Sequence, residues 1–282
     1  MEVSLKDSHE QFVHKWIETS MKAKKSDYQE TELVRIFCGT WNVNNKTSEE
    51  ESIASWILAD GIDNAADIYA IALEEIVDLS TYNVVFDDST SQERAKYWLQ
   101  KVAAVLSSTG VKFTAVHEKH LVGMAIFVFV RESLLQAVSD VRGAVAGVGV
   151  MRMMGNKGGV AIRLNFYETS LCFIGSHFAA SRGNVATRNT DFRSILDKIT
   201  FSPSDIAKTK LRPWYKAEAD LTKVLYPLQH DQIYWFGDFN YRIEESLSLA
   251  EIYSKIDENN IAYLLEHDQL NIERQNNRVF QV

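Results

Sequence analysis

The sequence predicts an α/β fold, on three observations. Short apolar, β-branched and aromatic runs, which are typical of buried strands, alternate with stretches whose apolar residues recur at helical spacing. Of the 282 residues, 46% are hydrophobic and 24% are charged, as in an ordinary globular protein. Only 3 prolines and 13 glycines are present, which argues against long disordered tracts. A chain of this length forms one large domain or two small ones around a substantial core.

The cysteines and the amino terminus indicate an intracellular protein. Cys38 and Cys172 both lie within apolar strand-like runs, so we expect two buried free thiols rather than a disulfide, as in a reducing compartment. Residues 1–12 lack the basic and then apolar layout of a signal peptide. The longest apolar run, 121–130, falls well short of the ~20 residues that a membrane helix needs, and we interpret it as a core strand.

The net charge of -8 argues against a nucleic-acid partner, because nonspecific duplex binding relies on extended lysine and arginine surfaces. An acidic chain can still bind an anionic substrate through a local positive pocket. Arg152, Lys157 and Arg242 are candidates for such a pocket, and a divalent metal ion would add to its charge.

The spacing of apolar residues predicts the elements in chain order. In the first half we expect a helix at 9–24 that packs through an apolar stripe, a strand at 33–38, a helix at 48–60 with a capping box at Ser48 and Glu51, a strand at 67–73, a helix at 92–106, and paired strands at 111–116 and 121–130. In the second half we expect a β-rich stretch at 142–150, a strand after the glycine-rich bend at 152–159, a strand at 170–176, a helix at 182–199, a loop with a short helix at 202–226, a strand at 233–236, and helices at 247–256 and 260–266.

The stretch 234–242 carries the strongest chemical signal. Asp238, Asn240 and Arg242 alternate where a buried strand ends, and period-two spacing would send their side chains to one face. A carboxylate and an amide beside a guanidinium suit a phosphate site with a hard metal ion or an activated water. The alternative for this stretch alone is a strand followed by a polar turn.

Other polar groups also follow strand-like runs. Asn42 caps a turn or holds a metal-bound water or phosphate oxygen. Glu74 and Glu75 follow a buried strand, where α/β sheets place their ligands, and one of them could anchor Mg²⁺; two solvated loop acids are the alternative. His177 ends another strand, and as a lone histidine it would more often be structural than catalytic.

The bend at 152–159 is a further candidate, for phosphate binding. Its glycines allow close backbone approach, and Asn156 and Lys157 supply an amide and a cation. It is no P-loop, because the required spacing is absent and a strand follows. A hairpin turn with a chance lysine is the alternative.

Taken together, these motifs resemble those of the inositol polyphosphate 5-phosphatases, most of all the type II group of the Lowe-syndrome protein. The resemblance runs from about Leu33 to Val282. It rests on GTWNVN (39–44), LEEIVDLS (73–80), MRMMGNKGGVAIR (151–163), SHFAA (176–180), the RN-x-DF of 188–192 and WFGDFNYRI (235–243).

The resemblance implies a four-layer α/β sandwich of the endonuclease/exonuclease/phosphatase type, in which two packed mixed sheets are flanked by helices. Residues 1–30 would form an amphipathic helix and lead-in, and residues 31–282 the catalytic domain. The implied roles are metal binding for Asn42 and Glu75, catalysis for His177, Asp238 and Asn240, and substrate binding for Asn156, Lys157 and Arg242.

The chain also departs from the family pattern. Glutamine usually precedes the metal glutamate, where this chain has Glu74, and a histidine is common where Ser181 stands. The family's PTYK-like, WCDRI-like and SDHRPV-like segments are not found before residue 282. We therefore expect an incomplete catalytic domain with exposed sheet edges and a tendency to aggregate.

The expected function is Mg²⁺-dependent hydrolysis of the 5-position phosphate of phosphatidylinositol polyphosphates, and of soluble inositol polyphosphates. Its partners would be phosphoinositide head groups, for a cytoplasmic protein peripheral on endomembranes or the plasma membrane. Small-GTPase or trafficking partners would bind through further C-terminal regions. Two alternatives stay open, an inactive chain that binds lipid or protein, and a Mg²⁺-dependent nuclease of the same superfamily.

Overall fold

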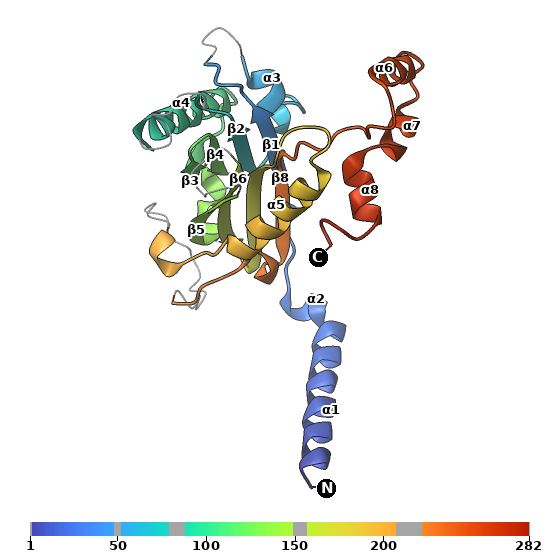
Figure 1. The fold of residues 1–282 in the computed structure, drawn as a ribbon. Helices are drawn as coiled ribbons and strands as arrows, with labels where there is room; N and C mark the ends of the chain where they lie inside the picture. Colours follow the sequence, from blue (N-terminus) through green and yellow to red (C-terminus); the bar gives the residue numbers. More distant parts are fainter. Residues whose placement is uncertain (1, 48–51, 79–87, 149–156, 207–221, 282) are drawn as a thin grey trace. The chain divides into compact units, whose positions relative to one another are not determined.

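Two compact units make up the chain in a computed structural model, residues 1–34 and 35–282. The structure describes residues 2–47, 52–78, 88–148, 157–206 and 222–281 (Figure 1). The first unit contains helices α1 (Glu2–Ala23) and α2 (Lys25–Tyr28). Phe12 and Trp16 of α1 are 68% and 63% exposed, so within this unit the predicted apolar stripe is not covered.

The second unit contains two four-stranded sheets. The first has the order β1-β2-β4-β3 and the second β5-β6-β7-β8. The strands are β1 (Ile36–Asn42), β2 (Ile68–Glu74), β3 (Phe113–Leu121), β4 (Met124–Arg131), β5 (Val138–Gly147), β6 (Gly158–Phe166), β7 (Thr169–His177) and β8 (Gln232–Asp238). In each sheet one pair is parallel, β1 with β2 and β7 with β8, and the other neighbours are antiparallel.

The helices of this unit flank the sheets or follow β8. They are α3 (Ala54–Ile57), α4 (Asp88–Ser107), α5 (Val185–Lys198), α6 (Leu249–Asp257), α7 (Ile261–Glu266) and α8 (Gln269–Gln275). Figure 1 shows α4 beside the first sheet and α5 beside the second. Two helical predictions differ from the structure. The helix expected at 48–60 is reduced to α3, with Ser48 and Glu51 outside the described residues, and the final region holds three helices because α8 follows α7 directly.

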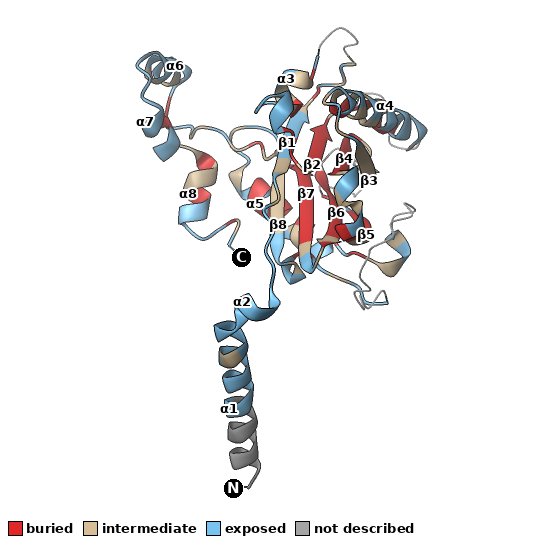
Figure 2. Cartoon of the chain, turned by 180° about the vertical axis from the view of Figure 1, so that it is seen from behind, coloured by how far each residue is buried: buried red, intermediate tan, exposed pale blue. Residues whose placement is uncertain are grey.

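Apolar side chains fill three interfaces, which makes four layers. Trp98 and Val102 of α4 pack on the outer face of the first sheet, and Phe192 and Ile195 of α5 pack on that of the second. Between the sheets the contact is close, because a Cβ at Gly175 would lie 2.6 Å from the Cβ of Ala72. The central strands β2, β4, β6 and β7 are accordingly almost wholly buried (Figure 2). This arrangement confirms the predicted four-layer sandwich.

The outer strands on one side of the sandwich are less covered. No residue of β8 is fully buried, and Gly39 is the one fully buried residue of β1. Cys172 is buried as predicted, but Cys38 is exposed, so the prediction for that thiol is wrong. The reason is topological: β1 is an edge strand, which an apolar sequence run cannot reveal.

Candidate active site

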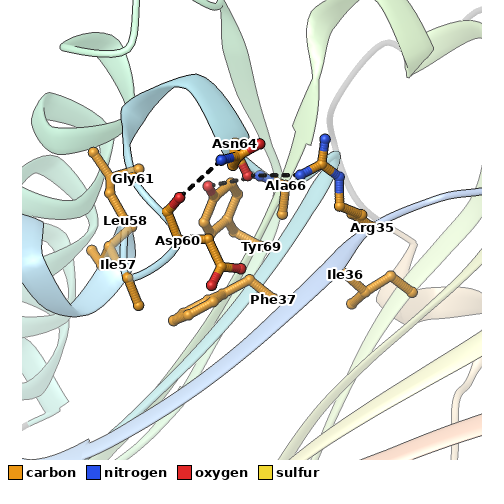
Figure 3. Close-up of a pocket in the computed structure, with 11 residues that line it drawn as sticks. Arg35, Ile36, Phe37, Ile57, Leu58, Asp60, Gly61, Asn64, Ala66 and Tyr69 are labelled. Carbon is orange, nitrogen blue, oxygen red and sulfur yellow. Dashed lines mark hydrogen bonds between the residues drawn. The ribbon is translucent and has the colours of Figure 1, made fainter.

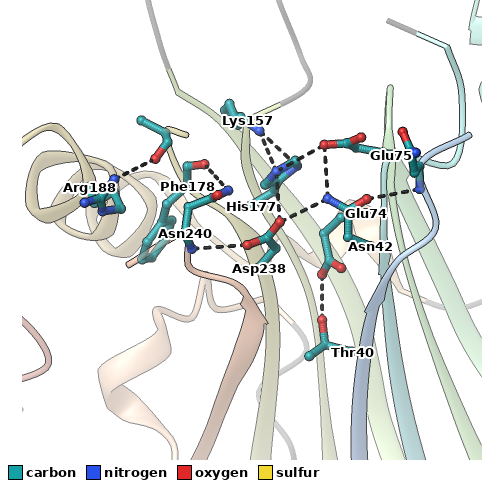
Figure 4. A network of polar contacts seen from close by, with 12 residues as sticks. Thr40, Asn42, Glu74, Glu75, Lys157, His177, Phe178, Arg188, Asp238 and Asn240 are labelled. Carbon is teal, nitrogen blue, oxygen red and sulfur yellow. Dashed lines mark hydrogen bonds and ion pairs between the residues drawn. The ribbon is translucent and has the colours of Figure 1, made fainter. Parts of the chain in front are cut away.

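The carboxyl ends of both parallel strand pairs bring the candidate residues together. Asn42 ends β1 opposite Glu74 of β2, and His177 ends β7 opposite Asp238 of β8. Because each pair is parallel and the two sheets pack face to face, all four ends meet at one edge of the sandwich (Figure 4). This is where α/β sheets place their ligands.

A single amide joins two carboxylates from different sheets. Asn42 Nδ2 donates to Glu75 Oε1 and to Asp238 Oδ2, both at 3.0 Å. The orientation of this amide is fixed, because the backbone N–H of Asn44 donates to Asn42 Oδ1 at 3.0 Å. Asn42 therefore presents its nitrogen to the carboxylates and its oxygen to the backbone.

His177 and Lys157 complete the cluster on the side of the second sheet. The histidine is buried, and its Nε2 lies 2.5 Å from Lys157 Nζ, 3.4 Å from Asp238 Oδ2 and 3.8 Å from Glu75 Oε1. Burial lowers the pKa of Lys157, while Glu75 and Asp238 act in the opposite direction. The site thus holds two carboxylates, an amide, an imidazole and a half-buried amine within hydrogen-bonding range.

Glu74 and Glu75 point in different directions although they are neighbours. Glu75 adopts a left-handed backbone with φ of 54°, which sends its side chain into the cluster. Glu74 is fully buried, and its Oε1 accepts from Thr40 Oγ1 at 2.8 Å. Burial, followed by the nearby charge of Asp238, raises the pKa of Glu74 to about 8. At neutral pH Glu74 is therefore mostly protonated and resembles the neutral glutamine that the family usually has there.

The segment after β8 turns instead of continuing as a strand. Asn240 has φ of 55°, and its N–H donates to Asp238 Oδ1 at 3.1 Å. Its side chain donates to the Phe178 carbonyl at 3.1 Å and accepts from Arg242 Nη2 at 2.7 Å. Arg242 itself is exposed, so it reaches the cluster through Asn240 and not by the alternation expected from the sequence.

A divalent cation fits the donors of this cluster. The oxygens Glu75 Oε1 and Asp238 Oδ2 converge on one amide nitrogen, and Mg²⁺ typically takes one or two carboxylates and retains several waters. In the described part of the chain, no group of three or more His, Cys, Asp and Glu side chains has the arrangement of a metal cage. An open site with two carboxylates is consistent with both observations.

The structure places seven of the eight candidate residues in or directly beside the cluster; Asn156 lies outside the described residues, as does Arg152. Two contributors escaped the sequence reasoning. Thr40 precedes Asn42 by two positions on the same strand face, so the period-two rule could have identified it. Arg188 had no such signal apart from its place in the RN-x-DF motif.

The described part of the second unit also contains a cavity away from the cluster, at the amino ends of β1 and β2 (Figure 3). Its volume is about 190 Å³. Arg35 Nη1 donates to the Asn64 carbonyl at 3.2 Å, and the Tyr69 hydroxyl accepts from the N–H of Ala66 at 2.9 Å. Since the candidate residues lie at the opposite ends of these strands, this cavity is separate from the candidate active site. No helix in the described residues is long and apolar enough to span a membrane.

A four-layer sandwich with carboxylates, an amide and a histidine at the meeting point of two parallel strand pairs defines a protein of the endonuclease/exonuclease/phosphatase class. The chain belongs to Endonuclease/Exonuclease/phosphatase family 2, whose sequence model matches residues 39–282, and its relatives are inositol polyphosphate 5-phosphatase catalytic domains. The resemblance drawn from the motifs is thereby confirmed.

Two curated relatives and one solved structure illustrate the similarity. Synaptojanin of Caenorhabditis elegans is 34% identical over 262 residues, which are 88% of this chain and 21% of that protein. Type II inositol 1,4,5-trisphosphate 5-phosphatase of Mus musculus is 32% identical over 257 residues, 91% of this chain and 24% of that protein. The chain thus spans about a quarter or less of these relatives.

The solved structure is the inositol polyphosphate 5-phosphatase domain of SPsynaptojanin in complex with inositol (1,4)-bisphosphate and a calcium ion. It has a TM-score of 0.76 and 30% identity, and the match covers 95% of this chain and 70% of that one.

Proposed function

We propose that this chain hydrolyses the 5-position phosphate of phosphatidylinositol polyphosphates in a Mg²⁺-dependent reaction, with soluble inositol polyphosphates as further substrates. The observation that carries the proposal is the convergence of Glu75 and Asp238 on Asn42, beside His177 and Lys157, in a chain whose relatives include phosphatases named for this position. The solved relative holds a calcium ion and an inositol bisphosphate, which supports a divalent cation and an inositol phosphate at this site.

Glu75 and Asp238 would hold the magnesium ion, with the amide of Asn42 keeping the two carboxylates together. When bound, the ion would neutralise negative charge on the scissile phosphate. Asp238 also accepts a proton from, and orients, the water that attacks phosphorus in line with the departing inositol oxygen. Lys157 supplies a positive charge to the phosphate, and no covalent enzyme intermediate is required.

The remaining residues keep these groups in place. His177 lies between Lys157 and the two carboxylates, so it fixes their spacing and stabilises negative charge that develops on the phosphate. Asn240 holds Asp238 through its backbone N–H and positions Arg242, whose exposed guanidinium contacts further phosphates of the inositol ring. Residues 31–282 are the catalytic domain in this proposal, and the protein acts peripherally at a membrane surface.

Phosphate release from vesicles tests the proposal. Phosphatidylcholine vesicles containing phosphatidylinositol 4,5-bisphosphate are incubated with the purified chain, with Mg²⁺ or with EDTA, beside Asp238→Asn. The substitution preserves the volume of the side chain and removes its charge, so release should need Mg²⁺ and fall by at least about a hundredfold in the variant. A parallel assay with soluble inositol 1,4,5-trisphosphate separates lipid from head-group recognition.

Release that persists in EDTA would contradict the metal-dependent mechanism. A folded chain that binds the vesicles and releases nothing would instead be a lipid-binding module, and the proposed activity would be wrong. Cleavage of DNA at a rate above that of the inositides would identify a nuclease.

A further inference from the structure

The two segments that carry the candidate catalytic groups are loops, and each leaves a strand at the site. One follows β7 and contains Phe178 to Arg182, and the other follows β8 and runs from Asp238 to Arg242. They contact each other directly at one place, where the Phe178 N–H donates to the Asp238 carbonyl at 3.0 Å and the side chain of Asn240 donates to the Phe178 carbonyl at 3.1 Å. Irregular backbone of this kind keeps its shape only where its polar groups are satisfied.

Arg188 satisfies the carbonyl groups of the first loop. It lies near the start of α5 and is fully buried. Its Nη1 donates to the carbonyls of Ala179 and Ser181, at 3.2 and 2.6 Å, and its Nη2 donates to that of Arg182 at 3.2 Å. Ser181 has φ of 77°, a strained conformation for a residue with a side chain, so these bonds hold the backbone in a shape that it would not choose alone.

Gln269 of α8 connects the same guanidinium to the second loop. Its Oε1 accepts from Arg188 Nη2 at 2.7 Å and from the Arg242 N–H at 2.9 Å, and its Nε2 donates to the Arg182 carbonyl at 2.9 Å. The guanidinium also lies 5.0 Å from the ring centre of Tyr241, in the second loop. Arg188 and Gln269 therefore contact both loops, and both side chains are buried (Figure 4 shows Arg188 behind the site).

The chemistry of Arg188 indicates a geometric task rather than a contribution to stability. Its described hydrogen-bond acceptors are neutral carbonyl and amide oxygens, and its Nε is buried without a partner in the described residues. A buried cation with such acceptors costs free energy that an apolar side chain of similar volume would not. What an apolar residue cannot supply is the planar fork of donors that spans several carbonyls at once.

We propose that Arg188, together with Gln269, is a positioning residue that sets the separation of His177 and Asp238 by holding the loops after β7 and β8 in register. This inference rests on the proposed phosphatase function. Arg188 does not contact the substrate or the reacting atoms. It acts through the backbone on either side of the two catalytic groups.

Three variants test this role. Arg188→Lys keeps the charge but cannot span the carbonyl groups and Gln269, and Gln269→Leu removes the second half of the connection. The matched control is Arg142→Lys, because Arg142 is also fully buried and donates to backbone carbonyls, of Phe201 and Lys223, in a part of the second sheet away from the site. Thermal unfolding is recorded for all three, so that loss of stability is separated from loss of alignment.

We expect kcat on phosphatidylinositol 4,5-bisphosphate vesicles to fall about tenfold to a hundredfold in Arg188→Lys and in Gln269→Leu, with KM changed less than about threefold, because misplacement of reacting groups by about 1 Å costs rate and not ground-state binding. Arg142→Lys should lose a similar amount of thermal stability and retain kcat. Full kcat in folded Arg188→Lys or Gln269→Leu would overturn the proposal. An equal loss of kcat in Arg142→Lys would also overturn it.

A second readout does not depend on the substrate. In a calorimetric titration with Mg²⁺, Arg188→Lys and Gln269→Leu should bind the ion at least about threefold more weakly than the wild type, because Asp238 no longer meets Glu75, whereas Arg142→Lys should match the wild type. If the wild-type chain binds Mg²⁺ but releases no phosphate, the proposed function fails, and this titration alone decides the role of Arg188. Unchanged Mg²⁺ affinity in both variants would then contradict it.

Discussion

Gly237, one residue before Asp238, has a backbone that no other residue type adopts comfortably. Its φ is 135°, and a Cβ there would lie 2.1 Å from the Ser176 carbonyl oxygen of the neighbouring strand β7. The close approach lets β8 run against β7 up to its last residue and so brings Asp238 level with His177. The sequence shows Gly237 as the boundary of an apolar run, but the reason for glycine is the adjacent backbone, which only the folded sheet reveals.

Gly237→Ala should therefore destabilise the protein strongly. We expect a loss of roughly 3 kcal/mol or more, from steric overlap added to backbone strain, and a fall in the unfolding midpoint of about 6 to 12 °C. Gly61→Ala is the matched control, since Gly61 also has positive φ (87°) but nothing within 4 Å of its Cβ position. Its cost should be about 1 kcal/mol, from strain alone. Equal midpoints for the two variants, measured by circular dichroism, would refute the steric explanation.

The residue chemistry of the cluster was largely predictable from sequence, but its connections were not. Polar residues at strand ends identified Asn42, Glu75, His177 and Asp238, because parallel strands place their carboxyl ends at one edge. The protonated state of Glu74 depends on burial between sheets, and the bond from Asn42 to Asp238 joins residues 196 positions apart. Neither follows from local spacing.

Among the elements, the segment that leads into β8 is held by a histidine with a defined tautomer. His230 Nδ1 donates to the Pro227 carbonyl at 2.9 Å, and its Nε2 accepts from Arg163 Nε at 3.0 Å. Arg163 in turn pairs with Asp140 of β5. Burial lowers the pKa of His230, and protonation of Nε2 would remove the acceptor for Arg163.

This segment should make stability depend on pH. The folded state holds the pKa of His230 below its ordinary value of 6.5, so between the two pKa values the unfolded chain binds more protons than the folded one. The contribution of His230 is complete above about pH 6.5 and declines as the pH falls through the lowered folded value. The unfolding midpoint of the wild type should thus drop on acidification from pH 7.5.

His230→Gln isolates this effect from that of other titrating groups. Glutamine retains a donor for the Pro227 carbonyl and an acceptor for Arg163 but does not titrate. The difference in midpoint between wild type and variant should therefore shrink or reverse between pH 7.5 and 5.5, measured by differential scanning fluorimetry. A difference that stays constant over that range would show that His230 does not titrate on unfolding.

Element types were mostly predicted correctly, and the errors have physical causes. Apolar runs located all eight strands, because their central residues are buried on both faces. Helix lengths after β8 were harder to predict, because α6, α7 and α8 are short and their ends depend on capping side chains such as Asn260 and Asp268. The pairing order of the strands, and hence which ones form edges, required the three-dimensional structure.

At the scale of the whole molecule, one side of the sandwich is open. Strands β1 and β8 are edge strands of different sheets and lie against each other. Within the described residues, no strand pairs with the outer edge of either one. Tyr234, Trp235 and Phe236 of β8 are only partly buried there, and Cys38 of β1 is exposed. Unpaired backbone groups beside apolar side chains form a template for strand pairing with a second molecule.

We expect this open side to cause reversible self-association that grows with protein concentration. Cys38→Lys places a charge on the β1 edge, where Lys opposes edge-to-edge pairing, and should shift the equilibrium toward the monomer. Cys38→Ser is the control, because it removes the thiol without adding charge and should associate like the wild type in reducing buffer. Sedimentation velocity over a wide concentration range distinguishes the three proteins. If Cys38→Ser becomes monomeric as completely as Cys38→Lys, the association depends on the thiol; if neither variant changes it, association uses another surface, and in both cases the edge-pairing explanation fails.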